Sequence, residues 1–360
     1  MAKASVDGSS SAVERIDSSA YKLLVSCPQG ISRHQLSVIF EEVYDRVPHP
    51  DAELEYNVNE LWDLRVQQNK SLYNGMKFRY GGHSLQTEHN FKKDSKISLH
   101  LGLTDYRTFV GTNLNPSWAK FLVSSDDIAV RCRHMSSPLG NGAIIETPDD
   151  KILMLQRSNN VGEFPGFLVF PGGHPEPKEV SISSHQCDRD LDLGLVNEKI
   201  SEEMFDSIIR EVVEEIGVPA ECLSDPIFIG ISLREMNVRP AAFFYIKCSL
   251  SPEAIDHFYN GAQDGYESTK LLAVSKTDAC EWTSRMPGCH QGGYALYKLM
   301  LMARKDATTS KSLHLIEGRG ALYNLHYCTS SMTHLWVWNL EESRKGHSRR
   351  LIMFYRLSLG

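Results

Sequence analysis

Three glutamates stand close together near the middle of the chain, at Glu211, Glu214 and Glu215. The apolar residues around them recur at the spacing of an amphipathic helix, which is expected to begin near Ser201 and to stop at Gly217. Positions i, i+3 and i+4 share one helix face, with about 5 to 6 Å between their Cβ atoms, so the three carboxylates repel one another. A hard divalent cation such as Mg²⁺ binds oxygen ligands and removes that repulsion. The spacing therefore indicates a metal site, and a solvated acidic helix face is the alternative.

A glycine-rich turn lies upstream of this helix, in the segment FPGGHPEPKE at residues 170–179. The segment follows an apolar run typical of a strand. Its adjacent glycines, Gly172 and Gly173, permit a tight turn that brings the backbone close to a ligand or a metal. The turn therefore favours the metal site over the solvated helix face.

The two segments together resemble the Nudix box, the signature of hydrolases that act on a nucleoside diphosphate linked to another group. The resemblance rests on Gly173, the five residues after it and Glu179, and then on REVVEEIGV at residues 210–218. In the family, seven residues separate that first glutamate from the arginine. Here residues 180–209 intervene, which is 209 − 180 + 1 = 30 residues, or 30 − 7 = 23 more. The motif is therefore split, and a strict pattern search would miss it.

Other segments narrow the resemblance to the UDP-glucose (UDP-sugar) pyrophosphatase branch of the Nudix hydrolases. They are LGLTDYR at residues 101–107, GTN at residues 111–113 and EST at residues 267–269, together with FPGGHPEP. The similar region runs from about Tyr21 to Arg304. The resemblance implies an α/β (α+β) protein in which a Nudix α/β/α sandwich follows a smaller α+β domain.

The expected domain organisation has four parts. Residues 1–19 are polar and are expected to be a disordered lead. Residues 20–135 are expected to form the α+β domain, and residues 138–305 the Nudix domain with a loop-like insertion at about residues 180–200. Residues 306–360 show no clear period, and their structure and role stay unassigned.

Periodicity predicts the individual elements. Strands are expected at residues 21–27, 77–80, 97–101, 142–146, 151–157, 167–170, 226–232, 241–248 and 271–274. Besides the acidic helix, helices are expected at residues 32–43, 51–69, 116–123, 251–259 and 294–303.

Hydrolysis of a pyrophosphate requires neutralisation of its charge and a positioned water, and a metal ion can serve both needs. We expect Glu211 and Glu215, one helical turn apart, to bind Mg²⁺, with Mn²⁺ as an alternative ion. Glu214 is expected to be a third ligand or the base that takes the proton of the water. The resemblance implies that the carbonyl of Gly172 completes the metal shell.

Four residues of the box are expected to have structural roles. Arg210 and Glu179 are expected to form an ion pair that orients the helix against the glycine turn. Gly173 belongs to the turn, and Gly217 ends the helix.

Three further residues are candidates for contacts with the phosphates or the sugar. Arg157 ends a predicted strand, and its fork of donors could bind a phosphate; an exposed surface arginine is the alternative. His174 and Glu176 lie on the glycine turn and could contact phosphate or sugar hydroxyl groups, with simple solvation as the alternative.

The resemblance also implies roles for two aromatic residues and one late glutamate. Tyr73 and Tyr106 match positions at which UDP-sugar relatives place rings near the nucleotide, and a flat ring suits stacking on uracil; packing within the first domain is the alternative. Glu267 is placed like an additional glutamate that some Nudix enzymes use as a metal ligand or base.

Composition argues against several other classes of protein. The net charge of −7 and the pI near 6.1 argue against nonspecific binding of nucleic acid or of an anionic membrane. The eight cysteines are scattered without a C-x-x-C pair, so neither a zinc site nor a disulfide framework is indicated. With neither a long apolar run nor a secretory signal, we expect a cytoplasmic protein, although organellar targeting stays open. The oligomeric state also stays open.

The function expected from the residues and the resemblance is Mg²⁺-dependent hydrolysis of UDP-glucose or UDP-galactose to UMP and a sugar 1-phosphate. One alternative is a different nucleoside diphosphate derivative, such as an ADP-sugar, NADH or coenzyme A. Another is a noncatalytic nucleotide-binding protein, in which the insertion displaces the glycine turn from the acidic helix.

Overall fold

The computed structural model describes residues 19–70, 72–85, 97–159, 161–185 and 193–309. Seven strands of these residues form one mixed sheet, in the order β1-β8-β9-β5-β6-β10, with the short β7 paired to β6. Strands β5 and β9 are parallel, and the other neighbouring pairs are antiparallel. The strands are β1 (Tyr21–Ile31), β5 (Gly140–Glu146), β6 (Lys151–Arg157), β7 (Leu168–Val169), β8 (Ile227–Arg234), β9 (Arg239–Lys247) and β10 (Ser268–Ser275).

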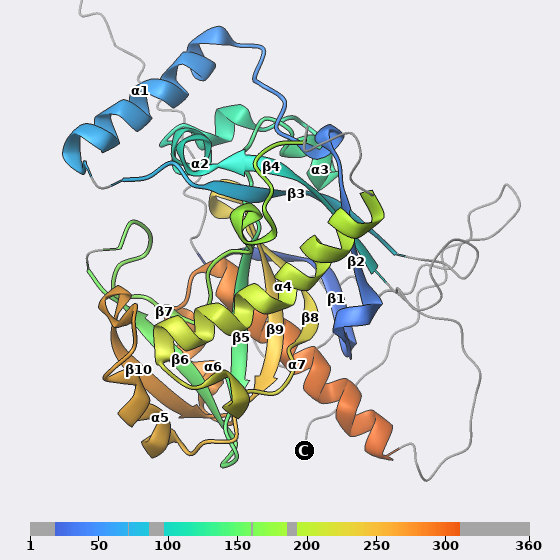
Figure 1. The fold of residues 1–360 in the computed structure, drawn as a ribbon, viewed down its shortest axis with the longest axis vertical. Helices are drawn as coiled ribbons and strands as arrows, with labels where there is room; N and C mark the ends of the chain where they lie inside the picture. Colours follow the sequence, from blue (N-terminus) through green and yellow to red (C-terminus); the bar gives the residue numbers. More distant parts are fainter. Residues whose placement is uncertain (1–18, 71, 86–96, 160, 186–192, 310–360) are drawn as a thin grey trace, which may run out of the picture.

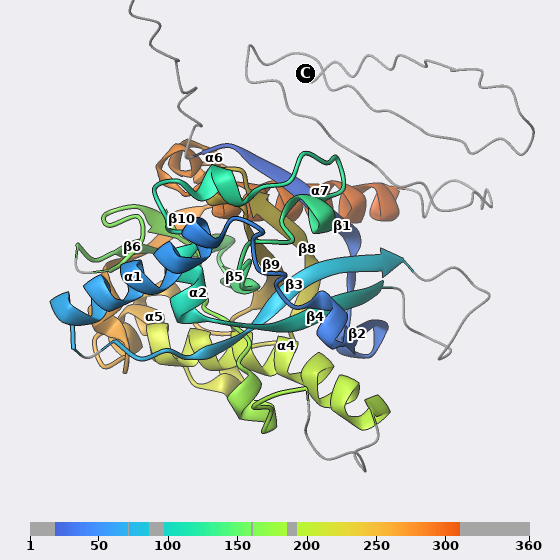
Figure 2. The same cartoon turned by 90° about the horizontal axis from the view of Figure 1, so that it is seen from above.

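Helices cover both faces of this large sheet, as Figure 1 and Figure 2 show. On one face lie α4 (Leu193–Ile216) and α5 (Pro252–Tyr259), and on the other α6 (Ala279–Trp282) and α7 (Gly288–Thr309). Successive strand residues alternate between the two layers: Ala143 and Ile145 belong to the core under α4, whereas Ile144 belongs to the core under α7. The expected α/β/α sandwich is therefore confirmed.

The described residues also form a second sheet, of three strands in the order β2-β4-β3. Strand β2 is parallel to β4, and β3 is antiparallel to β4. Its strands are β2 (Leu36–Phe40), β3 (Met76–Leu85) and β4 (Ile97–Asp105). The same part of the chain contains the helices α1 (Ala52–Gln68), α2 (Tyr106–Gly111) and α3 (Ile128–Arg131). Buried residues of this sheet share one hydrophobic core with α4, so the small sheet packs onto the acidic helix.

The structure departs from the expected elements at the start of the chain. Strand β1 pairs with β8 at the edge of the large sheet, although the sequence places it in the first domain. The helix expected at residues 32–43 is wrong, because residues 36–40 form β2. Leu36, Val38 and Phe40 are buried in alternation, which is the period of a strand, and Val43 is 74% exposed. The division into two domains stays a prediction.

The acidic helix is longer than expected. It begins at Leu193 and not near Ser201, so the second part of the expected loop-like insertion is helical. Ile200 is fully buried against the sheet, and this packing extends the helix backwards. Residues 116–123 contain only a short 3₁₀ turn, at residues 118–121, in place of the expected helix.

The remaining expected strands and helices are present, with ends shifted by a few residues. Asp51 caps α1, Ser251 caps α5, and α7 extends to Thr309. Residues 1–18 of the expected disordered lead, and the tail from residue 310 onward, lie outside the described residues. Among the described helices, none combines the length and the apolar character that crossing a membrane requires.

Candidate functional site

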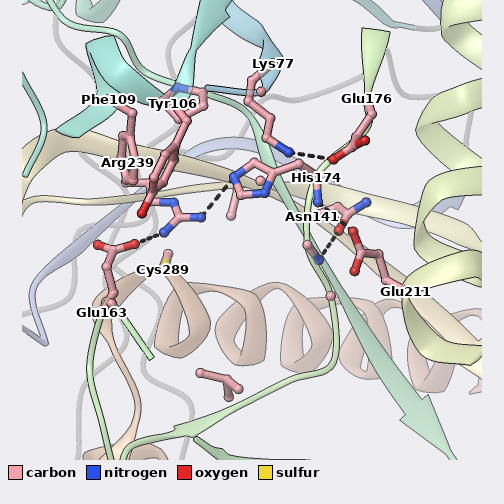
Figure 3. A pocket seen from close by; sticks show the side chains of 18 of the residues that line it. Lys77, Tyr106, Phe109, Asn141, Glu163, His174, Glu176, Glu211, Arg239 and Cys289 are labelled. Carbon is pink, nitrogen blue, oxygen red and sulfur yellow. Dashed lines mark hydrogen bonds and ion pairs between the residues drawn. The ribbon is translucent and has the colours of Figure 1, made fainter. Parts of the chain in front are cut away.

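A cavity of about 730 Å³ lies where the small sheet, the glycine turn, α4 and the start of α7 meet. Figure 3 shows part of its lining, with Glu211 on one side, Arg239 and Glu163 on the other, and His174 between them. Of the residues proposed from the sequence, those that line it are Tyr73, Tyr106, Arg157, Gly172, Gly173, His174, Glu176, Glu211, Glu215 and Glu267. The fold therefore brings most of the candidate residues into one hollow.

Two carboxylates of α4 face this cavity and are held by the glycine turn. Glu215 accepts a hydrogen bond from the backbone N–H of Gly172 (2.8 Å), and Glu211 accepts one from the backbone N–H of His174 (3.1 Å). These contacts show that the insertion does not displace the glycine turn from the acidic helix. The alternative in which such a displacement abolishes catalysis therefore loses its structural basis.

Both carboxyl groups are perturbed by burial. Burial raises the pKa of Glu211 to about 7. The hydrogen bond from His174 acts to lower this pKa, and the nearby charge of Glu214 acts to raise it. Burial also raises the pKa of Glu215 well above its usual range, with the charges of Glu211 and Glu267 acting in the same direction. Two neighbouring carboxyl groups, one buried and one partly buried, whose ionisation is disfavoured are an arrangement that a cation would stabilise.

The close approach of turn and helix requires both glycines. At Gly172, where φ is +152°, a Cβ atom would lie 2.4 Å from the carbonyl oxygen of Asn141. At Gly173, a Cβ atom would lie 2.0 Å from a carboxylate oxygen of Glu211. Asn141 also accepts a hydrogen bond from the N–H of Gly173 (2.7 Å). A larger residue at Gly173 would push the turn away from Glu211, and one at Gly172 would push it away from the backbone of β5.

The oxygen donors present fit a Mg²⁺ ion that keeps part of its water shell. No group of three His, Cys, Asp or Glu side chains in the described parts of the chain is arranged to hold a metal by itself. Mg²⁺ typically uses only one or two carboxylates, together with waters and substrate phosphates. Glu211 and Glu215 can supply those carboxylates, and Glu267 lines the same cavity. Gly172 is placed beside them, and the role of its carbonyl group stays a prediction.

Glu214 differs from its two neighbours, because its side chain is not part of the cavity lining. Its backbone carbonyl accepts a hydrogen bond from the N–H of Asp264 (2.9 Å). Its role as a third ligand or base stays a prediction.

The expected ion pair between Arg210 and Glu179 is wrong. Arg210 instead pairs with Glu203, one of whose oxygens lies 2.7 Å from Nη2 of the arginine. The same oxygen of Glu203 accepts a hydrogen bond from the backbone N–H of Glu176 (2.9 Å), whereas Glu179 pairs with Lys178. Glu203 is seven residues before Arg210 on one helix, and this spacing is the signal that could have identified it.

Gly217 ends the helix as expected. It follows the last residue of α4 with φ of +78°, and a Cβ atom there would lie 2.6 Å from the carbonyl oxygen of Phe258. Glycine adopts this left-handed conformation without a steric penalty.

Arg157, His174 and Glu176 all line the cavity but have different surroundings. Nε of Arg157 donates to the carbonyl of Glu163 (2.9 Å). The pKa of His174 is held well below its usual value by burial and then by the charges of nearby lysine and arginine groups, so the imidazole is neutral. Glu176 pairs with Lys77 (2.6 Å) as well as with Lys178 (2.8 Å).

The two tyrosines lie on the small-sheet side of the cavity. Tyr73 is 81% exposed, so its ring is open to a ligand. Tyr106 lines the cavity and also packs edge-on against Trp62, with 5.9 Å between ring centroids. Tyr106 therefore makes a packing contact and also faces the cavity, and its role near the nucleotide stays a prediction.

Sequence reasoning missed a buried cluster of charges in the same cavity. Glu163 pairs with Arg234 (2.7 Å) and with Arg239, whose Nη2 lies 3.0 Å from Nε2 of His174. Burial raises the pKa of Glu163, but the charges of Arg239 and Arg234 outweigh it and lower the pKa to about 2. No local sequence pattern predicts this cluster, because Glu163 is more than seventy residues from both arginines in the sequence. Lys77 and His290 also line the cavity and were not identified from the sequence.

Comparison with known proteins identifies relatives over most of the chain. A scan against protein-family models finds no match. Nudix hydrolase 9 of Arabidopsis thaliana is 57% identical over 292 residues, which cover 81% of this chain and 94% of that protein. The uridine diphosphate glucose pyrophosphatase of Mus musculus is 34% identical over 257 residues, which cover 70% of this chain and 80% of that protein.

Comparison with solved structures finds matches of low sequence identity. A MutT protein from Methanosarcina mazei is 16% identical to this chain with a TM-score of 0.26, and the match covers 47% of this chain and 94% of that one. The extent and identity of the sequence matches, together with the sandwich fold, show that this chain is a hydrolase belonging to the Nudix family.

Proposed function

We propose that this Nudix hydrolase cleaves UDP-glucose or UDP-galactose between its two phosphates in a Mg²⁺-dependent reaction, releasing UMP and a sugar 1-phosphate. The observation that carries the reaction type is the pair of carboxylates of Glu211 and Glu215, which the glycine turn holds in a cavity that basic side chains also line. The mouse relative supports the uridine substrate, since its name describes a uridine diphosphate glucose pyrophosphatase.

The size and chemistry of the cavity suit such a substrate. About 730 Å³ lies within the range of pockets for small organic molecules. Tyr73 and Tyr106 offer rings for a base, and the basic side chains of the lining can bind the diphosphate.

The residues of the chain have separate roles in this proposal. Glu211 and Glu215 hold Mg²⁺, which when bound would polarise the phosphoryl oxygens and lower the pKa of a water. Arg157 donates N–H groups to a phosphate oxygen and stabilises the charge of the transition state. Glu267, which lines the cavity and whose pKa is raised by burial, takes the proton of the attacking water at its carboxylate. Gly172 and Gly173 keep the carboxylates in place through the tight turn.

Product analysis tests the proposal directly. UDP-glucose, UDP-galactose, ADP-glucose, NADH and coenzyme A are incubated separately with the protein, with Mg²⁺ or with EDTA, and the products are separated by ion-exchange chromatography. We expect UMP and sugar 1-phosphate in equal amounts from the UDP-sugars, with Mg²⁺ alone. Preferential cleavage of ADP-glucose, NADH or coenzyme A would overturn the uridine assignment, and equal turnover in EDTA would overturn the metal requirement.

A further inference from the structure

Three arginines line the cavity, and Arg239 lies on the side away from Glu211. Arg157, Arg234 and Arg239 all line it, and Glu163 is the acidic side chain that binds Arg234 and Arg239. Figure 3 shows Arg239 and Glu163 on the opposite side of His174 from Glu211. This concentration of guanidinium groups is suited to an anion with several oxygens.

We infer that Arg239 binds the diphosphate of the substrate and that Glu163 is the positioning residue that aims it. This inference rests on the proposed function and extends it, because it assigns the ligand that lies between the carboxylates and the arginines. The side chain of Arg239 is 19% exposed in a cavity wall, so a ligand can reach it. A guanidinium has five N–H donors, and the described contacts to Glu163 and His174 use two of them.

Arg234 and Glu163 act as a fixed support for Arg239. Arg234 is 2% exposed and donates through Nε to the side chain of Asn237 (2.9 Å) and through Nη2 to Glu163 (2.7 Å). Its guanidinium also lies over the ring of Phe164, at 4.5 Å from the centroid. Because these contacts fix Arg234, the carboxylate of Glu163 that pairs with it is also fixed and can orient the guanidinium of Arg239.

Two contacts from the small-sheet side complete the support. The guanidinium of Arg239 lies over the ring of Phe109 at 5.2 Å, so the ring covers a face of the group and not the N–H donors that Glu163 and His174 leave unused. Asn113 donates to the carbonyl of Asn237 (2.8 Å), in the turn that leads into Arg239. The GTN segment at residues 111–113 therefore stabilises the turn that presents the arginine.

Ligand binding without metal tests this inference separately from the reaction. UDP and uridine are titrated by calorimetry in EDTA into the parent, Arg239→Gln and Arg239→Lys. We expect Arg239→Gln to weaken the binding affinity for UDP at least tenfold and that for uridine less than twofold. Arg239→Lys should recover part of the UDP affinity, because it keeps a positive charge but loses the planar set of N–H donors of the guanidinium. Arg46→Gln is the matched control, since Arg46 is also partly buried and paired, with Glu55, but does not line the cavity.

A double-mutant cycle tests the positioning role of Glu163. If Glu163 acts through Arg239, KM for UDP-glucose in Glu163→Gln/Arg239→Gln should equal that in Arg239→Gln alone, and Glu163→Gln should raise KM more than it lowers kcat. Additive losses would contradict the positioning role. Thermal melts of every variant show whether a lost affinity reflects unfolding.

Several outcomes overturn the inference, and they differ from failure of the proposed function. UDP affinity within twofold of the parent in folded Arg239→Gln would overturn it, as would absence of metal-free UDP binding by the parent. If UDP-glucose is cleaved with an unchanged KM in Arg239→Gln, the inference fails and the proposed function stands. If UDP-glucose is not cleaved but Arg239→Gln weakens the binding of both UDP and ADP, the inference stands and the substrate assignment fails.

Discussion

The backbone N–H of Gly172 donates a hydrogen bond to Glu215, with 2.8 Å between the nitrogen and Oε2. The contact joins two halves of a motif that residues 180–209 separate in the sequence. It leaves the carboxyl group in the cavity but buried, and this burial raises its pKa. The consequences of this arrangement can be measured.

Glu215→Gln should lower kcat for UDP-glucose by roughly 100-fold or more, because a lost metal ligand removes several kcal/mol of transition-state stabilisation. Glu214→Gln should lower kcat less, since the Glu214 side chain does not line the cavity. Glu202→Gln, on the same helix but paired with Arg33, is the control and should match the parent. Steady-state rates at saturating Mg²⁺ measure all three, and a larger loss in Glu214→Gln than in Glu215→Gln would contradict this order.

Glu203→Ala should destabilise the fold by about 2 kcal/mol, because it leaves Arg210 and the backbone N–H of Glu176 without the oxygen that accepts their hydrogen bonds. Glu179→Gln should change the stability by no more than about 0.5 kcal/mol, since its ion pair with Lys178 is exposed and long. Urea unfolding compares the two variants with the parent. Equal losses of unfolding free energy in the two variants would mean that Glu179 stabilises this region as much as Glu203 does.

Glu163→Gln should alter the acid dependence of stability. The pKa of Glu163 is lowered in the fold to about 2 from an ordinary 4.5, so its ionised form stabilises the folded state fully above pH 4.5. That contribution is lost as the pH falls from 4.5 towards 2. The difference in unfolding free energy between parent and variant should therefore be largest near pH 7 and shrink below pH 4.5, as urea titrations from pH 7 to pH 3 can show. A difference that stays constant over this range would count against the ion pairs of Glu163 as its source.

Tyr73→Ala should raise KM for UDP-glucose by roughly 5- to 150-fold with kcat retained, because stacking of a base on an aromatic ring contributes about 1 to 3 kcal/mol. The ring is 81% exposed, so its removal should leave the melting temperature unchanged. Tyr56→Ala removes another exposed ring, on α1, and is the control. A KM equal to that of the parent would assign base binding elsewhere in the cavity.

Local spacing within the sequence determined the chemistry of the acidic helix and the glycine turn. Glu211 and Glu215 lie one turn apart on any helix, and the adjacent glycines allow a close approach wherever the chain folds. Short apolar runs on either side of a turn likewise predicted the strands β5 and β6. These features depend on neighbours within a few residues, so they can be read without knowing the fold.

Tertiary structure decided which groups distant in the sequence meet at the site. The sequence suggested Glu179 for Arg210; the spacing of Glu203 on the same helix could have given that ion pair, but only the fold brings Glu203 to the backbone N–H of Glu176. Glu163 meets Arg239 across 76 residues of chain, because the turn after β6 and the start of β9 border the same cavity. Ion pairs of this kind depend on burial and on long-range packing, and no periodic pattern in the sequence encodes them.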